Sequence, residues 1–472
     1  MSDGAPVLLW LRRDLRLRDH PALTAAAARG AVIPVFIRDE AVSALGAAPA
    51  FRLGLGLETL SKALDVQGSR LILRSGLARD VLQALVRETN ARAVYWTRNF
   101  DPTYRERDAA IKAELKQQGI EAQSFDGQLL FEPQTVQTGA GGPYRVYTPF
   151  WRAVSGREVP SCLAQPLKIP IPPNWPASET LSDWKLAGRM QRGADVLRPH
   201  AQPGEDAAQS RLAGFASGPI AVYKDQRDLP GVAGTSHLSE HLALGEISAR
   251  QCWHAGWRAL NEGGAGAETF LKELVWREFS YHLAYHTPHL LTGNWKQDWD
   301  AFPWQTDPNH PHVRAWKMGR TGIPFVDAAM REMYVTGRMH NRGRMIVASY
   351  LTKHLLTDWR IGRDWFQDCL IDWDPAANAM GWQWAAGSGP DAAPYFRVFN
   401  PVTQLKKFDP NGLYARHWIA EGQSNPPASA LSYFDAIPRR WGLEPSASYP
   451  APIVTAEEGR KRALEAFQNR QF

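Results

Sequence analysis

Short apolar stretches alternate with helix-like stretches over the first 130 residues. The apolar stretches are rich in β-branched and aromatic side chains, which favour strands: PVLLWL, AVIPVFI, RLILRS and AVYWTR, with a fifth strand expected near IEAQSFD. Helix-forming stretches separate them, among them PALTAAAARG, GLETLSKALDV, ARDVLQALVRETN and YRERDAAIKAELKQQG. This alternation predicts a parallel sheet with helices on both faces, an α/β Rossmann-like domain over residues 1–130.

The pattern changes twice after this region. Residues 131–205 are rich in Pro and Gly, which predicts a long connector with little regular structure. Over residues 206–472 apolar residues recur at helical spacing and strand signals are scarce, as in SEHLALGEISARQCWHAGWRAL and RMIVASYLTKHLLTDW. We therefore predict an all-α C-terminal domain.

Composition adds few constraints. A length of 472 residues favours two domains, and a net charge of +6 suits a phosphate-bearing partner, although many basic proteins bind no nucleic acid. Cys162, Cys252 and Cys369 are far apart, which argues against a disulfide framework and against a metal site. The start lacks a signal-peptide pattern, and no window approaches the roughly 18 apolar residues of a membrane helix. We expect a cytoplasmic protein without a membrane segment.

The sheet domain lacks the usual nucleotide-binding devices. RRDLRL follows the first strand where a dinucleotide-binding domain would carry GxGxxG, and no GxxxxGK[ST] is present. The domain therefore holds a different ligand or serves a structural role.

Five motifs carry a resemblance to the photolyase/cryptochrome family. They are WLRRDLRLRDHPAL (10–23), GTSHLSEHLALGEIS (234–248), ELVWREF (273–279), the stretch GRTGIPF to LLTDWR (319–360) and the stretch DWDPAANAM to RVFNP (372–401). They occur in order, and the match extends from residue 7 to about residue 420. The resemblance implies a light-driven flavin enzyme with an α/β antenna domain and a helical FAD-binding domain.

The resemblance also implies which residues hold FAD. Thr and Ser ahead of a helical pattern predict capping residues, and free N–H groups at a helix start attract phosphate, although in isolation this pattern would indicate only a capped helix. The family holds the FAD diphosphate with the 234–248 motif. The implied FAD contacts are Tyr223, Thr235, Ser236, His237, Leu238, Ser239, Lys272, Arg277, Asn341, Arg344, Asp372, Trp373, Asp374 and Asn378.

At two of these positions, Asp372 and Asn378, the chemistry of the side chain suggests its role. An unpaired carboxylate beside the apolar GWQW would be costly, so Asp372 needs a cationic partner, and the family places the arginine matching Arg344 there, beside the isoalloxazine ring. Asn378 matches the position facing flavin N5, where a neutral amide suits a reduced, anionic flavin. Photolyases typically carry Asn there, and plant cryptochromes carry Asp.

The chain contains 19 tryptophans, most of which we expect in the core. By resemblance, Trp382, Trp359 and Trp304 form an electron-hopping chain from the flavin to the surface, although the segment after Trp304 is slightly longer than usual. Trp373 is an additional Trp within DWDP, and Arg338 replaces a Trp that is common in the family. Because of these two differences, we keep as an alternative hypothesis that the electron-hopping chain has a side branch through Trp373.

The family extrudes its DNA lesion from the duplex into a pocket beside the flavin. The implied aromatic wall is Trp276 and Trp384, and Glu273 bonds the pyrimidine edge and stabilises the radical anion. The other implied lesion and DNA contacts are Asn341, Arg342, Met345, Arg277 and Arg397. Relatives that repair (6-4) products carry histidines at the positions of Asn341 and Met345, so this sequence favours cyclobutane pyrimidine dimers.

The implied activity is light-driven repair of these dimers in UV-damaged DNA, by electron transfer from excited reduced FAD. Glu273, Asn378, Trp382, Trp359 and Trp304 are the implied catalytic residues. A cryptochrome-type blue-light photoreceptor and a (6-4) photolyase are the alternatives, and a dark flavin oxidoreductase would need an NAD(P) site that the sequence does not contain. A monomer is the family's usual state.

A second chromophore is also implied, either methenyltetrahydrofolate or a deazaflavin between the domains. RNFDPTYRERD (98–108) lies in the relevant region but lacks the Asn-Glu pair of the class I folate pattern. FDGQLLFEP (125–133) and HLAYHTPHLL resemble the class III group near plant cryptochromes, whose folate site differs. We favour folate, with a deazaflavin as the alternative.

Overall fold

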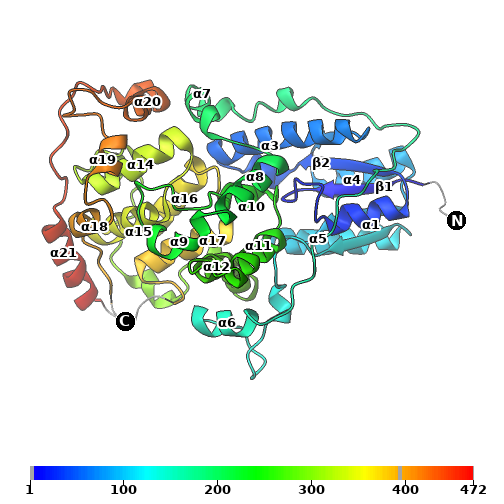
Figure 1. The fold of residues 1–472 in the computed structure, drawn as a ribbon, viewed down its shortest axis with the longest axis horizontal. Helices are drawn as coiled ribbons and strands as arrows, with labels where there is room; N and C mark the ends of the chain where they lie inside the picture. The colour runs from blue at the N-terminus through cyan, green and yellow to red at the C-terminus, as the bar shows by residue number, and fades with distance from the viewer. Residues whose placement is uncertain (1–4, 392–395, 471–472) are drawn as a thin grey trace.

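The computed structural model describes residues 5–391 and 396–470. A parallel sheet with its covering helices lies beside a larger helical region (Figure 1). This is the predicted fold class. Residues 392–395, within the last sequence motif, lie outside the described residues, and the division at residues 130 and 205 stays a prediction. Within the described ranges, no helix combines the length and apolar character that a membrane span requires.

The sheet is parallel throughout, with strand order β3-β2-β1-β4-β5. The strands are β1 (Val7–Leu11), β2 (Val32–Arg38), β3 (Ile72–Ser75), β4 (Ala93–Thr97) and β5 (Glu121–Phe125), so the expected fifth strand is confirmed. Successive residues of β1 join different cores. Val7 and Leu9 pack on the side of α1 (Pro21–Arg29) and α3 (Ala47–Val66). Leu8 and Trp10 pack on the side of α4 (Ala78–Thr89) and α5 (Pro102–Gln117), as the alternation of side chains along a strand requires.

The turn after β1 docks the sheet domain onto the helical region. In open α/β sheets this edge, where the strand order reverses, usually binds a ligand. Here the backbone N–H of Leu15 donates to Leu244 O (3.1 Å), and Arg16 Nη1 donates to Gly245 O (3.0 Å). A Cβ at Gly245, whose φ is +67°, would lie 2.0 Å from Arg13 O, so only glycine permits this close approach. The cavity left at this edge has a volume of only about 90 Å³.

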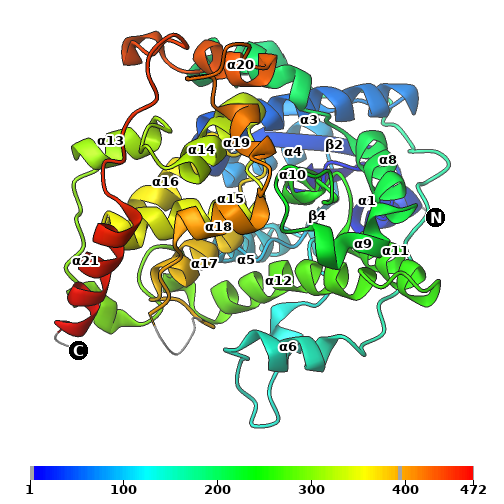
Figure 2. The same cartoon turned by 60° about the vertical axis from the view of Figure 1, so that its left-hand side comes forward.

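The connector contains more helix than the sequence predicted. It includes α6 (Tyr147–Val154) and α7 (Gly193–Leu197), together with several 3₁₀ turns. Tyr147 and Phe150 of α6 bury their rings against α12, which supplies the apolar contact that a Pro- and Gly-rich composition conceals. In Figure 2, α6 and the loop before it project beneath α12.

Helices make up the remainder of the described chain. They are α8 (Glu205–Ala216), α9 (Pro219–Gln226), α10 (Ser239–Leu244), α11 (Ala249–Asn261), α12 (Ala267–His286), α13 (Pro311–Lys317), α14 (Pro324–Thr336), α15 (Asn341–Ser349), α16 (Trp359–Cys369), α17 (Pro375–Ala386), α18 (Pro401–Phe408), α19 (Leu413–Trp418), α20 (Ala428–Ala436) and α21 (Ala456–Gln468). Helix α17 packs against α12, α15 and α16 and so occupies the centre of this region. The scarcity of strand signals correctly predicted this all-α architecture.

A buried ion network joins α3 of the sheet domain to the start of the helical region. The guanidinium of Arg52 is fully buried and contacts Glu240 Oε2 at 2.9 Å and Glu246 Oε2 at 2.5 Å. His241 Nδ1 lies 2.6 Å from Glu246, and Arg338 also pairs with Glu240. Breaking such a network by removing one partner leaves an uncompensated buried charge.

We expect Arg52→Met to lower the free energy of unfolding by about 3–5 kcal/mol, because Glu240 and Glu246 lose their shared cation in a buried setting. Lys62→Met on the same helix is the control, since the pair of Lys62 with Glu58 is exposed and contributes about 0.5 kcal/mol or less. Urea unfolding followed by circular dichroism measures the free energy of unfolding of both variants and of the wild type. Equal effects of the two substitutions would contradict this account of the network.

Candidate functional site

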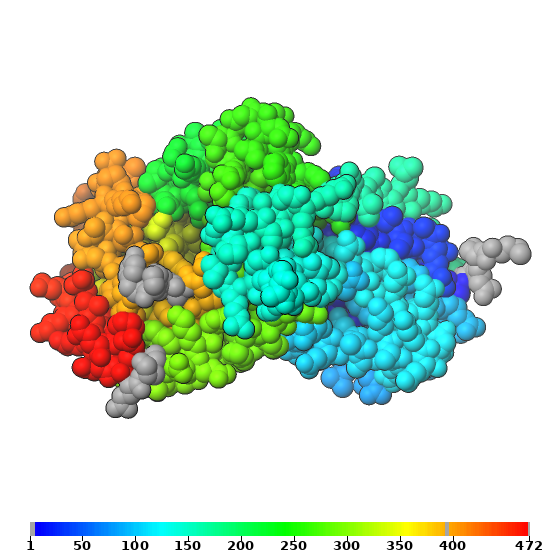
Figure 3. Space-filling view, turned by 90° about the horizontal axis from the view of Figure 1, so that it is seen from below, coloured from blue at the N-terminus to red at the C-terminus, as the bar shows by residue number. Residues whose placement is uncertain are grey.

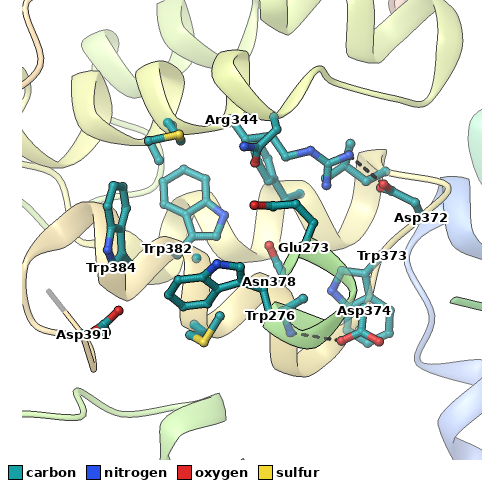
Figure 4. Close-up of a pocket in the computed structure, with 18 of the residues that line it drawn as sticks. Glu273, Trp276, Arg344, Asp372, Trp373, Asp374, Asn378, Trp382, Trp384 and Asp391 are labelled. Atoms are coloured by element: carbon teal, nitrogen blue, oxygen red, sulfur yellow. Dashed lines mark hydrogen bonds and ion pairs between the residues drawn. The ribbon is translucent and has the colours of Figure 1, made fainter. Parts of the chain in front are cut away.

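A cavity of about 750 Å³ opens among α12, α15, α16 and α17 (Figure 4). Most residues that the sequence analysis assigned to FAD or to the lesion line this one space. They are Glu273, Trp276, Asn341, Arg344, Met345, Asp372, Trp373, Asp374, Asn378, Trp384 and Arg397, and Trp382 of the expected hopping chain lines the same space. The fold therefore brings together positions that lie up to 124 residues apart, from Glu273 to Arg397.

Helix α17 contributes several of these side chains because of how it begins. Pro375 occupies the first turn, where its fixed φ suits a helix start, and the side chain of Asp374 accepts a hydrogen bond from Ala377 N (3.0 Å). Asn378 and Trp382, four residues apart, then lie on the same face of the helix and line the cavity.

The second oxygen of Asp374 connects α17 to the sheet domain. Asp374 Oδ2 accepts hydrogen bonds from Arg13 Nη2 (2.9 Å) and from the Tyr281 hydroxyl (2.6 Å), and Arg13 also reaches Tyr281 (2.9 Å). Burial alone would raise the pKa of Asp374, but the charges of Arg13 and Arg277 hold it below its ordinary value. Asp374 is thus an ionised anchor, and Arg13 is a site-supporting residue that the sequence analysis missed.

The expected ion pair beside the flavin position is present. Arg344 Nη2 lies 2.7 Å from Asp372 Oδ2, and Arg344 Nε donates to Met339 O (2.9 Å). Asp372 Oδ1 and Trp373 Nε1 are buried without a hydrogen-bond partner in this structure. Buried polar atoms normally have partners, so the wall of this cavity offers an acceptor and a donor to a polar ligand, as an FAD site would.

Two further cavity residues are held in fixed orientations. Asn378 Nδ2 donates to Arg363 O (3.0 Å), and its amide oxygen and second N–H remain available to a ligand. Glu273 Oε1 pairs with Arg227 Nη1 at 2.5 Å, and burial raises the pKa of Glu273 although Arg227 opposes the rise. The guanidinium of Arg227 in turn lies over the ring of Tyr223 (5.6 Å). Tyr223 therefore reaches the site through Arg227, which lines the cavity and was not predicted.

The three tryptophans of the expected hopping chain differ in burial. Trp382 lines the cavity, is 2% exposed and packs against Phe366 (4.9 Å) and Trp316 (6.1 Å). Trp359 is fully buried and its Nε1 donates to Asn294 Oδ1 (2.9 Å). Trp304 is only partly buried. Exposure thus increases from the cavity residue and the buried middle residue to Trp304, and the role of the chain stays a prediction.

The prediction that the Thr and Ser side chains at 235–236 cap the following helix is wrong. Helix α10 begins at Ser239 after Leu238, and no side-chain hydrogen bond caps it. The polar side chains bond within the preceding turn instead: Ser236 Oγ accepts from Leu238 N (3.4 Å), and Thr235 Oγ1 lies 3.4 Å from His237 Nε2. None of the residues 235–239 lines the 750 Å³ cavity, and their contact with FAD phosphates stays a prediction.

Three predicted basic contacts are engaged outside the cavity. Lys272 pairs with Glu268 one helical turn away (2.9 Å). Arg277 contacts Glu278 and Gln128 O, each at 3.1 Å. Arg342 pairs with Asp228 at 2.5 Å. Their assigned contacts to FAD or DNA would need these pairs to be shared or exchanged.

The described residues contain no cluster of three or more side chains suited to hold a metal ion. Cys162, Cys252 and Cys369 are free.

Comparison with known proteins identifies the family. The family model for DNA photolyase matches residues 7–170, and the one for the FAD binding domain of DNA photolyase matches residues 270–469. The deoxyribodipyrimidine photo-lyase of Agrobacterium fabrum is 46% identical over 98% of each chain. A solved class III photolyase from Agrobacterium tumefaciens is 44% identical, with a TM-score of 0.88 over 98% of this chain and 97% of that one. Cryptochrome-1 of Arabidopsis thaliana is 34% identical, over 98% of this chain and 70% of that protein.

These matches extend over nearly the whole chain, and they define a protein of the photolyase/cryptochrome fold. The chain belongs to the DNA photolyase family.

We expect Trp382→Phe to block light-driven reduction of bound oxidised FAD, because phenylalanine is far harder to oxidise than tryptophan and Trp382 is the member of the chain that lines the cavity. Repair by chemically reduced protein should remain within about twofold of wild type, since the ring change is conservative. The absorbance of the flavin under blue light measures photoreduction, and the loss of dimers from an oligonucleotide measures repair by the chemically reduced protein. Equal loss of both would contradict the assignment.

Proposed function

We propose that this protein is a light-driven deoxyribodipyrimidine photo-lyase that splits cyclobutane pyrimidine dimers in DNA. One observation carries the proposal. A single cavity holds both the neutral amide and the Arg344–Asp372 pair expected beside a flavin, and the acidic and aromatic side chains expected around a flipped base pair. Cofactor and substrate would therefore meet without an intervening protein layer.

FAD fits the polar atoms of this cavity and, when bound in its reduced form, supplies the light-excited electron that opens the dimer's cyclobutane ring. The protein's own residues bind the cofactor, orient it and set the electrostatic environment around it. Arg344 would supply a positive charge to a flavin ring bound in this cavity, and Asp372 holds that guanidinium in place. Asn378 offers a neutral acceptor oxygen, so it can contact the cofactor without adding a negative charge.

The substrate end of the cavity suits an extruded dimer. Trp276 and Trp384 present flat apolar surfaces, and Glu273 presents a carboxyl group whose pKa is raised by burial, although its pair with Arg227 opposes the rise. The dimer carries polar carbonyl and N–H groups along its edge, with which this carboxyl group can form a hydrogen bond. Asn341 and Met345 line the same wall, and no histidine is among the described lining residues. This supports cyclobutane dimers over (6-4) products as the substrate.

We expect Glu273→Ala to lower dimer repair in blue light by roughly ten- to a hundredfold, the effect of losing a hydrogen bond to a charged or buried group. Flavin content should stay normal, because Glu273 pairs with Arg227 and not with the Arg344–Asp372 pair. Repair of a thymine-dimer oligonucleotide is measured in light and in darkness.

The matched control is Glu268→Ala, on the same helix but half-exposed and paired only with Lys272. It should leave repair unchanged. Wild-type protein that binds reduced FAD yet splits no dimers in light would overturn the proposed function and favour a cryptochrome-type photoreceptor. Repair that is intact in Glu273→Ala would overturn only the role of Glu273.

We also propose a position for the second chromophore. The cavity at the carboxyl edge of the sheet, of about 90 Å³, is far below the roughly 300–1,000 Å³ of typical ligand pockets. A second cavity, between α3, α14 and α16, measures about 710 Å³. Its lining combines aromatic rings with guanidinium groups: Tyr334, Trp365, Trp441, Arg189, Arg192, Arg439 and Arg440.

This chemistry favours a folate over a deazaflavin. A folate has a flat pterin ring that aromatic side chains can cover and glutamate carboxylates that arginines can bind. Arg189 and Arg192 already contact Asp368 and backbone carbonyls. Arg439 and Arg440 have no carboxylate partner among the described residues and are available for the ligand's carboxylates.

We expect Trp441→Leu to remove the near-ultraviolet absorbance of methenyltetrahydrofolate from protein reconstituted with it, while FAD stays bound. Loss of one aromatic wall weakens stacking by about 1–3 kcal/mol, or roughly ten- to a hundredfold in affinity. Trp175→Leu, outside this cavity, is the control. Wild-type protein that takes up no folate would contradict the choice of chromophore, and unchanged folate in Trp441→Leu would contradict its position.

A further inference from the structure

The lesion-facing tryptophan of α12 is covered on its other face by a residue of the connector. The ring of Tyr147, the first residue of α6, stacks on the indole of Trp276 with centroids 3.6 Å apart and planes 6° from parallel. No other aromatic pair in the described residues has centroids as close. Trp276 also lines the cavity, so its indole separates the cavity from Tyr147.

Tyr147 is itself held firmly. It is 7% exposed, and its hydroxyl donates to Lys272 O at 2.5 Å, one helical turn before Trp276. Phe279 packs edge-on against both rings of the stack at 5.8 Å. Burial and the charge of Glu273 raise the pKa of Tyr147, so the hydroxyl stays a donor throughout the physiological range. The stack is therefore fixed at both of its rings.

Tyr147 also contacts a second residue that lines the cavity. Its backbone N–H approaches the carboxylate of Asp391, where it counters the rise in pKa that burial causes. Asp391 lines the cavity and has a left-handed backbone, with φ at +53°. Figure 4 shows Asp391 on the Trp384 side of the cavity. Tyr147 thus links the Trp276 wall to the loop after α17.

The connector around α6 lies outside the wall of the main cavity. It lies in the middle of the face seen in Figure 3, between the sheet domain in blue and the later helices in yellow to red. None of the residues 131–205 lines the cavity of about 750 Å³. Tyr147 is therefore coupled to the cavity through the ring of Trp276, the carboxylate of Asp391 and the nearby charge of Glu273.

We propose that Tyr147 is a positioning residue for lesion recognition: by stacking on the far face of Trp276 it fixes the plane against which the extruded dimer packs, and so increases discrimination between damaged and undamaged DNA. This inference rests on the proposed function. An indole with one free face can change rotamer, and ordering it on binding reduces affinity. A stacked indole is already ordered before the dimer arrives, which is how supporting residues pre-organise a binding site.

The test compares the affinity of the FAD-bound protein for a thymine-dimer oligonucleotide and for the same undamaged sequence. Tyr147→Met fills most of the space without a flat ring. We expect it to reduce the ratio of the two affinities by roughly three- to tenfold, the contribution of one aromatic pair. Affinity for undamaged DNA should not change, because phosphate contacts dominate it. Tyr147→Phe keeps the stack and should keep the ratio within about twofold.

A double-mutant cycle separates positioning from general destabilisation. In a Trp276→Leu background, Tyr147→Met should have no further effect on the ratio, because the wall it supports is gone. Trp151→Leu, also on α6 but packed against Trp253, is the control and should leave the ratio unchanged. The rate of repair at saturating dimer should stay near wild type in Tyr147→Met, so that the loss is confined to binding.

Additive effects of Tyr147→Met and Trp276→Leu would overturn the proposal, as would an unchanged ratio in Tyr147→Met. If Tyr147→Met does not bind FAD, Tyr147→His, with a smaller flat ring, gives the same test and should lower the ratio by a smaller factor. Wild-type protein that does not discriminate damaged DNA would instead refute the proposed function. The two failures are therefore distinguishable.

Discussion

The carboxylate of Asp374 joins three parts of the molecule that the site depends on. One oxygen caps α17, and the other accepts hydrogen bonds from Arg13 of the sheet domain and Tyr281 of α12. The start of α17 is therefore fixed by residues from both domains. Because Asn378 and Trp382 follow at one and two turns, the orientation of the cavity wall depends on this buried charge cluster. A buried carboxylate is costly alone, and here every described partner is a donor or a cation.

The two aspartates of DWDP have different tasks although they are two residues apart. Asp374 is engaged at both oxygens, whereas Asp372 binds Arg344 through one oxygen and leaves the other buried without a partner. The first arrangement holds the scaffold, and the second leaves an acceptor at the cavity wall. Trp373 between them lines both the main cavity and the small cavity at the sheet edge. The motif thus lies between the main cavity and the carboxyl edge of the sheet.

Local patterns were sufficient for the architecture, whereas the residues that line the cavity were predicted from the resemblance of five motifs to the photolyase/cryptochrome family. The apolar strands, including β5, and the helical spacing after residue 206 follow from side-chain periodicity, which is a local property. Arg13 was missed because its partner Asp374 lies 361 residues away and nothing near it signals the contact. Tyr147 was missed for a similar reason, since its connector has the composition of a loop and becomes helical only where its rings pack on α12. At α10, Ser236 and Thr235 bond within their own turn, a choice between two local partners that sequence cannot resolve.

The central claim is that one cavity brings cofactor and dimer together for a light-driven, redox-neutral splitting reaction. The most direct test counts dimers split per molecule of purified, pre-reduced protein under blue light with no reductant added during turnover. This account predicts many dimers split per bound FAD in light and none in darkness, since the electron returns after each event. Splitting that stops at one dimer per FAD, or that proceeds equally in darkness, would contradict it.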